Sequence, residues 1–215
     1  MIIAIDGPSG AGKGTIARTL SQELGYRHVD TGAMYRAVAW KAIQDGLSLD
    51  GEDAIADLAR AAEIVVEGGV VLIDGEDITR AIRTPEIDSG ASAVARLPRV
   101  REVLVAQQRD LGAGGDIVME GRDIGTVVFP DADVKIYLDA SEEERARRRV
   151  TDVAHASSQS GHAAVAEAIK ARDTADSTRK ESPLIMAPDA IRIDTTSMPI
   201  MDVVDRVLAI VRERA

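Results

Sequence analysis

The sequence predicts an α/β protein with a mainly parallel five-stranded sheet flanked by helices. Three observations carry this prediction: short apolar runs recur along the chain, helix-like segments separate them, and a Gly-rich loop joins the first run to the first helix. Strands that alternate with helices form parallel sheets with both faces covered. The 215 residues, 45% hydrophobic and 29% charged, suit one globular unit of ordinary composition.

The expected strands are short β-branched apolar runs bounded by turn or helix signals. The first, IIAID at 2–6, is closed by Gly-Pro, and the segment KGTIARTLSQEL that follows the glycines has the apolar spacing of a helix. A second short strand precedes Asp30. The other three lie at 116–120, 134–139 and 191–194, and helix-like segments separate them.

Residues 63–82 have a different character from the rest of the chain. Two β-rich runs are joined by Gly68-Gly69, and Asp74-Gly75 precedes another apolar stretch. Paired glycines and Asp-Gly are typical hairpin turns. We therefore expect a hairpin or a small antiparallel three-stranded insert on the main sheet.

Composition excludes several classes of function. A net charge of -10 and 2% aromatic residues disfavour binding to a nucleic-acid polymer, which needs cations and stacking platforms. The apolar start MIIAI is too short for a signal or membrane segment, and the chain has no cysteine, so we expect a cytoplasmic protein without membrane partners. Of the 26 cations 21 are arginine, which favours small phosphorylated ligands.

The segment GPSGAGKGT at 7–15 predicts a phosphate-binding loop. Its glycines let successive N–H groups point inward, and the following helix adds its positive end. Lys13 can reach the β and γ phosphates of ATP, and Thr15 can hold Mg²⁺ directly or through water. The usual loop has Ser or Thr directly after the lysine, where this chain has Gly14. The alternative is a Gly-rich turn without a ligand.

The Gly-rich loop by itself does not identify the reaction, so other motifs must be considered. A GTPase needs an Asn-Lys-x-Asp motif, and this chain contains no Asn. In DTGAMYR, Thr31 or Asp30 can cap a helix that carries Arg36. Arg122 and Asp123 follow a strand, at the sheet edge where ligands bind in α/β proteins. Taken alone, these charges also fit surface ion pairs.

Five motifs together resemble the bacterial cytidylate kinase family, whose members are nucleoside monophosphate kinases with a phosphate loop. They occur in the family's order along nearly the whole chain: GPSGAGKGT, DTGAMYR, LPRVR at 97–101, EGRDIGTVVFP at 120–130 and RDTADSTR at 172–179. The resemblance implies transfer of the γ-phosphoryl group of ATP to CMP or dCMP, with Mg²⁺ as cofactor.

The resemblance also assigns residues. The loop residues that would bind ATP are Gly7, Pro8, Ser9, Gly10, Ala11, Gly12, Lys13, Gly14 and Thr15. The cytosine ring would be read by Ser92, Arg101 and Asp123, the acceptor phosphate bound by Arg36 and Arg122 near Thr31, and the sugar bound by Arg172, Asp176 and Arg179. Catalysis would fall to Lys13, Arg122, Arg148 and Arg179. The three sugar-binding residues have i, i+4, i+7 spacing, which places them on one face of a helix.

A helical lid is expected at 146–180, within one kinase unit. The core would comprise 1–30, 91–145 and 185–215, and the acceptor-binding region 31–90. In SEEERARRR at 141–149, Ser141 can cap a helix whose acids and arginines suit its dipole. We expect one or two of Arg145, Arg148 and Arg149 to contact the transferred phosphoryl group. The small, polar stretch 154–164 would be a surface loop.

Two other hypotheses remain open from the sequence. One is a kinase of the same fold that acts on UMP, AMP or a non-nucleotide acceptor, and the other is a non-catalytic nucleotide switch. A switch needs no second phosphate site, which argues against it. We expect a monomer, although no motif determines the oligomeric state. The three histidines form no metal-ligand or triad pattern, so they are expected to be structural or solvent-facing.

Overall fold

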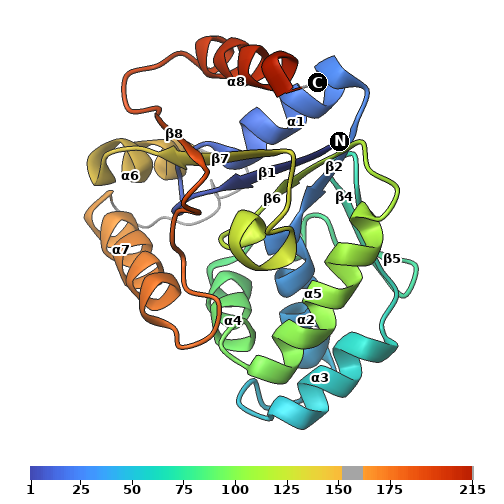
Figure 1. The fold of residues 1–215 in the computed structure, drawn as a ribbon. Coiled ribbons are helices and arrows are strands. Elements are labelled where there is room, and N and C mark those ends of the chain that lie inside the picture. The colour runs from blue at the N-terminus through green and yellow to red at the C-terminus, as the bar shows by residue number, and fades with distance from the viewer. Residues whose placement is uncertain (152–161, 215) are drawn as a thin grey trace. The chain divides into compact units, whose positions relative to one another are not determined.

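The computed structural model describes residues 1–151 and 162–214. The chain divides into two compact units (Figure 1), one formed by 1–29 with 112–215 and the other by 30–111. Among the described residues, no helix is long and apolar enough to cross a membrane.

A five-stranded sheet forms the centre of the first unit, in the order β2-β6-β1-β7-β8. Strand β1 pairs in parallel with β6 and β7, and β7 pairs in parallel with β8. The strands are β1 (Ile2–Asp6), β2 (Arg27–Asp30), β6 (Ile117–Glu120), β7 (Val134–Asp139) and β8 (Ile191–Asp194). The predicted fold class is therefore confirmed, with every expected strand present.

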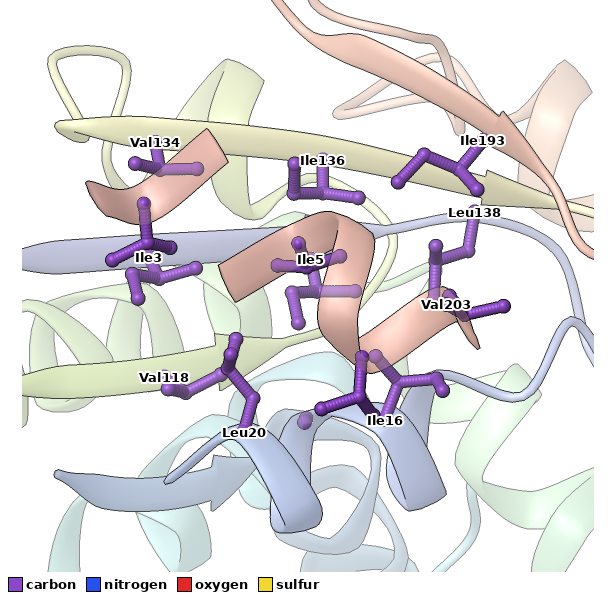
Figure 2. Close-up of a cluster of buried hydrophobic side chains, with 14 of the residues drawn as sticks. Ile3, Ile5, Ile16, Leu20, Val118, Val134, Ile136, Leu138, Ile193 and Val203 are labelled. Carbon is purple, nitrogen blue, oxygen red and sulfur yellow. The ribbon is translucent and has the colours of Figure 1, made fainter. Parts of the chain in front are cut away.

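One face of this sheet is covered by α1 (Lys13–Leu24) and α8 (Ile200–Arg214). The two helices place apolar residues at helical spacing toward the strands, so that each presents one apolar stripe. Figure 2 shows Ile16 and Leu20 of α1 gathered with Val203 of α8 against Ile3 and Ile5 of β1. All five side chains are buried. This core fixes the start of α1, and with it the end of the Gly-rich loop.

The carboxyl ends of the parallel strands meet at one edge of the sheet, which is where functional loops lie in this class of fold. The Gly-rich loop follows β1, and the segment that contains Arg122 and Asp123 follows β6. The residues after Asp123 form a short π-helix, η1 (Ile124–Val128), which the sequence did not predict. Such turns of π-helix are rare and often occur at functional sites.

Two further helices of the first unit are α6 (Glu142–Thr151) and α7 (His162–Thr178). Ser141 caps α6 as predicted, because its hydroxyl accepts from the Glu144 N–H at 3.3 Å. Most of the predicted loop 154–164 lies outside the described residues, but 162–164 belong to α7, so the loop prediction is wrong there. The Ala-rich run that begins at residue 163 favours helix.

The second unit combines helices with the predicted β insert. Its helices are α2 (Thr31–Gln44), α3 (Glu52–Ala61), α4 (Pro85–Val94) and most of α5 (Pro98–Gly112). The strands β3 (Ile64–Glu67), β4 (Val70–Ile73) and β5 (Glu76–Asp77) form an antiparallel sheet in that order, which confirms the three-stranded alternative. Ile73 and Ile78 pack with Ala33 and Ala37 of α2 in a separate small core.

Candidate active site

The Gly-rich loop adopts a conformation that only glycine tolerates at several positions. Gly7, Gly10 and Gly12 have φ angles of 146°, 79° and 93°. A Cβ on Gly7 would lie 2.0 Å from the backbone oxygen of Leu138. The loop is thus held against the end of β7 and leads into α1, which is the strand–loop–helix context that phosphate binding requires.

Lys13 is buried at the start of α1, and its Nζ donates to the Pro8 carbonyl oxygen at 2.8 Å. Burial, followed by the neighbouring Arg122 guanidinium, lowers the pKa of Lys13 to about 7, although Glu120 and Asp173 oppose the shift. Because an anion favours the charged form of a lysine, a bound phosphate would raise this pKa again. The lysine is therefore placed to respond to a phosphate in the loop.

Gly14 stands where the usual loop has Ser or Thr, and the structure supplies a reason for it. A Cβ at Gly14 would lie 3.3 Å from Oε1 of Glu120, the last residue of β6. Glu120 is itself buried and lies 3.0 Å from Nε2 of His28, which is buried too. A larger residue at position 14 would press on this buried pair. His28 thus has a structural contact with a buried carboxylate.

Asp176 pairs with Arg122, which is predicted to bind the acceptor phosphate, and with Arg179 of the predicted sugar-binding set. Its Oδ2 accepts from Arg122 Nε at 2.9 Å, and its Oδ1 lies 3.7 Å from Arg179 NH1. Burial alone would raise the pKa of Asp176, but Arg122, Arg172 and Arg179 outweigh it and hold the pKa below its ordinary value. Residue 179 lies one position beyond the end of α7, so its predicted place on the helix is wrong. The convergence of the trio on one ligand stays a prediction.

Arg145 on α6 supports the Gly-rich loop from a buried position. Its NH1 donates to the Ser9 carbonyl oxygen at 2.9 Å and its Nε to the Ala140 oxygen at 3.1 Å. The same guanidinium forms an ion pair with Asp173 of α7, whose other oxygen accepts from the Ser9 N–H. Both hydrogen-bonding groups of the Ser9 backbone are therefore occupied by this pair.

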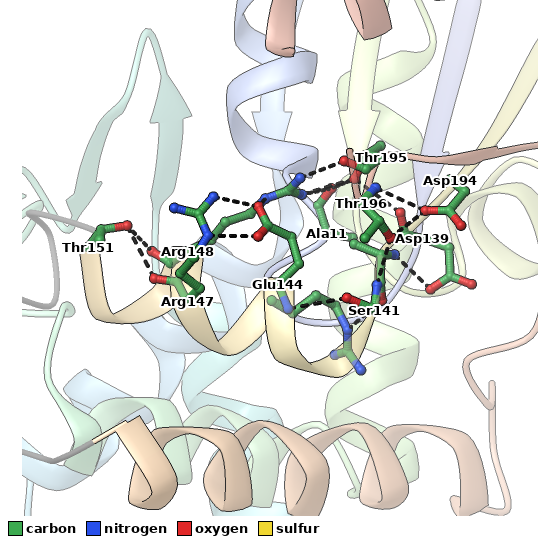
Figure 3. A network of polar contacts seen from close by, with 12 residues as sticks. Ala11, Asp139, Ser141, Glu144, Arg147, Arg148, Thr151, Asp194, Thr195 and Thr196 are labelled. Atoms are coloured by element: carbon green, nitrogen blue, oxygen red, sulfur yellow. Dashed lines mark hydrogen bonds and ion pairs between the residues drawn. The ribbon is translucent and has the colours of Figure 1, made fainter. Parts of the chain in front are cut away.

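Arg148 lies one turn further along α6 and also reaches the loop (Figure 3). Its guanidinium donates to Oγ1 and O of Thr195, at 2.9 and 2.6 Å, and to the Ala11 oxygen at 3.4 Å. Nε of Arg148 binds Glu144, which also binds the exposed Arg147. Arg145 and Arg148 of this run thus both contact the loop. NH1 of Arg148 also lies beside Gly12, 3.7 Å from the position that a Cβ would take there.

In the second unit, two carboxylates hold Arg36. Its Nε donates to Asp88 at 3.0 Å, and its NH1 lies 3.6 Å from Asp30. Asp30, and not Thr31, caps α2, since its Oδ1 accepts from the Ala33 N–H at 3.1 Å. Thr31 is the first residue of the helix and is buried.

The predicted base-reading residues of this unit lie on α4 and α5. The Ser92 hydroxyl donates to the backbone oxygen of Asp88 at 3.1 Å, so Asp88 contacts both Arg36 and Ser92. The guanidinium of Arg101 lies 5.6 Å from the centre of the Tyr35 ring, within cation–π range. Only 4% of Arg101 is exposed, which is unusual for an arginine and argues against a solvated helix charge.

Thr15 is exposed in the first turn of α1, so its hydroxyl is accessible to a metal ion. Within residues 1–151 and 162–214, no cluster of three or more His, Cys, Asp or Glu could hold a metal by itself. Mg²⁺ usually keeps several waters and binds substrate phosphates with few protein ligands. A single hydroxyl beside a phosphate loop therefore fits a magnesium ion that is brought mainly by the nucleotide.

Sequence reasoning missed three acidic residues that organise the candidate site. Asp173 binds Ser9 and Arg145, Asp88 holds Arg36, and Asp6 accepts from two N–H groups of η1. Only Asp6 carries a sequence signal, because it is a charged residue at the end of an otherwise apolar strand. The partners of the other two lie far away along the chain or on another helix.

Comparison with known proteins supplies the family context. The family model described as cytidylate kinase matches residues 3–213. A protein named cytidylate kinase from Solibacter usitatus is 48% identical over 216 residues, covering 100% of this chain and 93% of the relative. Another of that name, from Pelotomaculum thermopropionicum, is 50% identical over 212 residues, covering 96% of this chain and 94% of the relative.

Solved structures resemble this chain more distantly. A shikimate kinase from Bacteroides thetaiotaomicron has a TM-score of 0.53 at 11% identity, covering 99% of this chain and 98% of its own. A gluconokinase from Sinorhizobium meliloti has a TM-score of 0.52 at 14% identity, covering 99% of this chain and 92% of its own. At such low identity these structures support the fold alone.

Proposed function

Because this chain belongs to the cytidylate kinase family, we propose that it transfers the γ-phosphoryl group of ATP to CMP or dCMP, giving ADP and CDP or dCDP. The observation that carries this proposal is the match to the family over residues 3–213, which includes the loop, the arginines and the acids described above. The enzyme would thus act in pyrimidine nucleotide metabolism.

The donor nucleotide is proposed to bind the loop Gly7–Thr15 with its phosphates. The left-handed glycines and the start of α1 offer N–H groups to an anion, which supports this assignment. On binding, Nζ of Lys13 would exchange the Pro8 oxygen for a phosphate oxygen. Mg²⁺, when bound, would neutralise phosphate charge, with Thr15 as its protein ligand directly or through water.

The acceptor nucleotide is proposed to bind the residues that the family resemblance assigns to it. Arg36 and Arg122 would bind its phosphate near Thr31, and Ser92, Arg101 and Asp123 would read cytosine. The ring's N4 amine suits a carboxylate acceptor, and its O2 and N3 suit Arg or hydroxyl donors. The sugar would be bound by Arg172, Asp176 and Arg179. The ion pair between Arg179 and Asp176, together with the electrostatic effect of Arg172 on the pKa of Asp176, supports the last assignment.

The proposed reaction is an in-line attack of an acceptor phosphate oxygen on the γ-phosphorus of ATP, with ADP as the leaving group. The phosphate monoester dianion is already a nucleophile, so no strong general base is needed. Most of the rate would come from positioning and from charge neutralisation by Lys13, Arg122, Arg148 and Arg179. Residues 146–180 would act as a lid that excludes water.

We further propose that the protein is a monomer in the cytoplasm and that residues 31–90 form its acceptor-binding region.

A coupled assay of ADP formation with CMP, dCMP, UMP, AMP and GMP tests this proposal. We expect CMP or dCMP to be the best acceptor, and Asp123→Asn to lower the ratio of kcat/KM for CMP to that for UMP. Asp131→Asn, at an exposed position, is the matched control and should keep the ratio. Faster turnover of AMP would overturn the base assignment. Absence of turnover with every monophosphate, in protein that binds ATP, would overturn the kinase proposal.

A further inference from the structure

Asp6 links the strand that leads into the phosphate loop to the segment that follows β6. It is the last residue of β1 and only 5% of it is exposed. Its Oδ1 accepts from the Ile124 N–H at 2.8 Å, and its Oδ2 accepts from the Gly125 N–H at 2.7 Å. These N–H groups belong to the first residues of η1, directly after Asp123. One carboxylate therefore fixes the start of the segment that carries the proposed base-reading acid.

The surroundings of Asp6 leave these two N–H groups as its closest partners. Burial raises the pKa of Asp6 to about 6, and the negative charge of Asp123 adds to this rise. The hydrogen bonds from the Gly125 and Ile124 N–H groups lower the pKa, and the charge of Lys13 lowers it weakly. Lys135 packs nearby through its stem, but its ammonium binds Asp189 at 2.7 Å. A buried carboxylate is costly unless it is hydrogen-bonded, so this acid depends on η1, and the position of η1 depends on it.

Gly125 shows how closely the two segments approach each other. A Cβ at this position would lie 3.4 Å from Oδ2 of Asp6 and 3.2 Å from Cδ of Lys135. A Cβ there would crowd the stem of Lys135 and would come into van der Waals contact with the Asp6 carboxylate. The η1 backbone thus lies close to the Asp6 carboxylate, and the two hydrogen bonds to Asp6 hold it there.

We propose that Asp6 is a positioning residue for phosphoryl transfer, which holds Arg122 and Asp123 in register with the phosphate loop that begins one residue after it. This inference rests on the proposed function. Asp6 does not touch a substrate in this scheme. It acts through the η1 backbone, by keeping the proposed phosphate-binding arginine and the proposed cytosine-reading acid at a constant position relative to Lys13.

The variant Asp6→Asn tests the proposal, because an amide can accept one of the two N–H bonds but turns its own N–H₂ toward the other. Small misplacements of positioning groups cost up to about 100-fold in rate, so we expect kcat/KM for CMP to fall about 10- to 100-fold. The ratio of kcat/KM for CMP to that for UMP should fall about 10-fold, while KM for ATP changes less than about twofold. The ratio is independent of the folded fraction, so a merely structural role would not move it.

Asp133→Asn is the matched control, since Asp133 accepts from the Ile2 N–H at 2.6 Å, at the opposite end of β1. It should keep the wild-type ratio. If Asp6→Asn does not fold, Gly125→Val provides the test, because it keeps the carboxylate and adds two methyl groups beyond the Cβ that already contacts it, and the ratio should fall in the same way. A wild-type ratio and a wild-type KM for CMP in the folded variant would overturn the inference. Failure of the wild-type protein to phosphorylate CMP would instead overturn the proposed function, and this inference with it.

Discussion

The carboxylate of Asp173 accepts a hydrogen bond from the backbone N–H of Ser9, with a donor–acceptor distance of 3.0 Å. Arg145 binds the other oxygen of this carboxylate and also donates to the Ser9 oxygen, at 2.9 Å. Residues of α6 and α7 thus bind both the N–H and the C=O group of Ser9 in the phosphate loop. Because removing one partner of a buried pair leaves the other charge without compensation, this contact should matter for stability.

We expect Asp173→Asn to lower the free energy of unfolding by about 1–3 kcal/mol, because Arg145 remains buried with a weaker, uncharged acceptor. Urea unfolding monitored by circular dichroism measures the change. The matched control is Asp57→Asn, which breaks the exposed pair with Arg60, and should cost less than about 1 kcal/mol. Equal losses in the two variants would contradict a structural role of Asp173 in the loop.

Binding of ATP should be accompanied by proton uptake at Lys13. With a pKa of about 7 in the free protein, Lys13 is mainly neutral at pH 8.5, and a bound triphosphate would favour its charged form. Titration calorimetry at pH 8.5, in buffers of different ionisation enthalpy, should therefore show uptake of about one proton. In Lys13→Met this buffer dependence should disappear, whereas the exposed-site control Lys180→Met should keep it. Equal heats in all buffers for the wild-type protein would refute the prediction.

The same lysine should make the nucleotide-free protein more stable as the pH rises. Lys13 has a pKa of about 7 when folded and an ordinary value of 10.5, so between these values the unfolded chain binds more protons. Stability then increases with pH across this window. Urea unfolding from pH 7 to 10 measures the slope, and Lys13→Met should reduce it. A slope unchanged by the substitution would show that Lys13 is charged in the folded protein.

Arg148 should contribute to turnover in a way that its neighbour Arg147 does not. Arg148 reaches Thr195 and the loop oxygen of Ala11, whereas Arg147 is exposed and pairs with Glu144. Since lysine cannot reproduce the planar fork of arginine, Arg148→Lys should lower kcat by about 10- to 100-fold. Arg147→Lys should leave kcat within about twofold of wild type. Steady-state kinetics with saturating CMP and ATP would show equal effects if this assignment were wrong.

Arg101 should affect the use of the phosphoryl acceptor CMP and leave the binding of the phosphoryl donor ATP unchanged. Its guanidinium is buried over the Tyr35 ring, whereas Arg99, two residues earlier, is half exposed and pairs with the exposed Asp53. Loss of a base-reading hydrogen bond costs about 1–3 kcal/mol, so Arg101→Ala should lower kcat/KM for CMP about 10- to 100-fold. The KM for ATP should stay unchanged, and Arg99→Ala should behave as wild type. Equal loss of affinity for both nucleotides in Arg101→Ala would point to a folding defect.

Local patterns in the sequence determined most of the fold. The β-branched run IIAID, its Gly-Pro end and the helical spacing of Ile16 and Leu20 depend on residues close together in the chain, so they could be recognised without a structure. The paired glycines at 68–69 likewise marked the antiparallel insert. The order of motifs also identified the family, because each motif is a local signal and five of them occurred in sequence.

Tertiary structure alone decided which charged residues became buried partners. Arg145 and Arg147 belong to one run of arginines, yet the first is buried against the loop and the second is exposed. The bonds from η1 to Asp6 join residues 118 and 119 positions apart. Such pairs arise from the packing of parallel strands and their covering helices, which brings distant segments to one sheet edge. The periodicity of the sequence predicts which face of a helix or strand is buried. Which residue of another element contacts that face depends on how the elements pack.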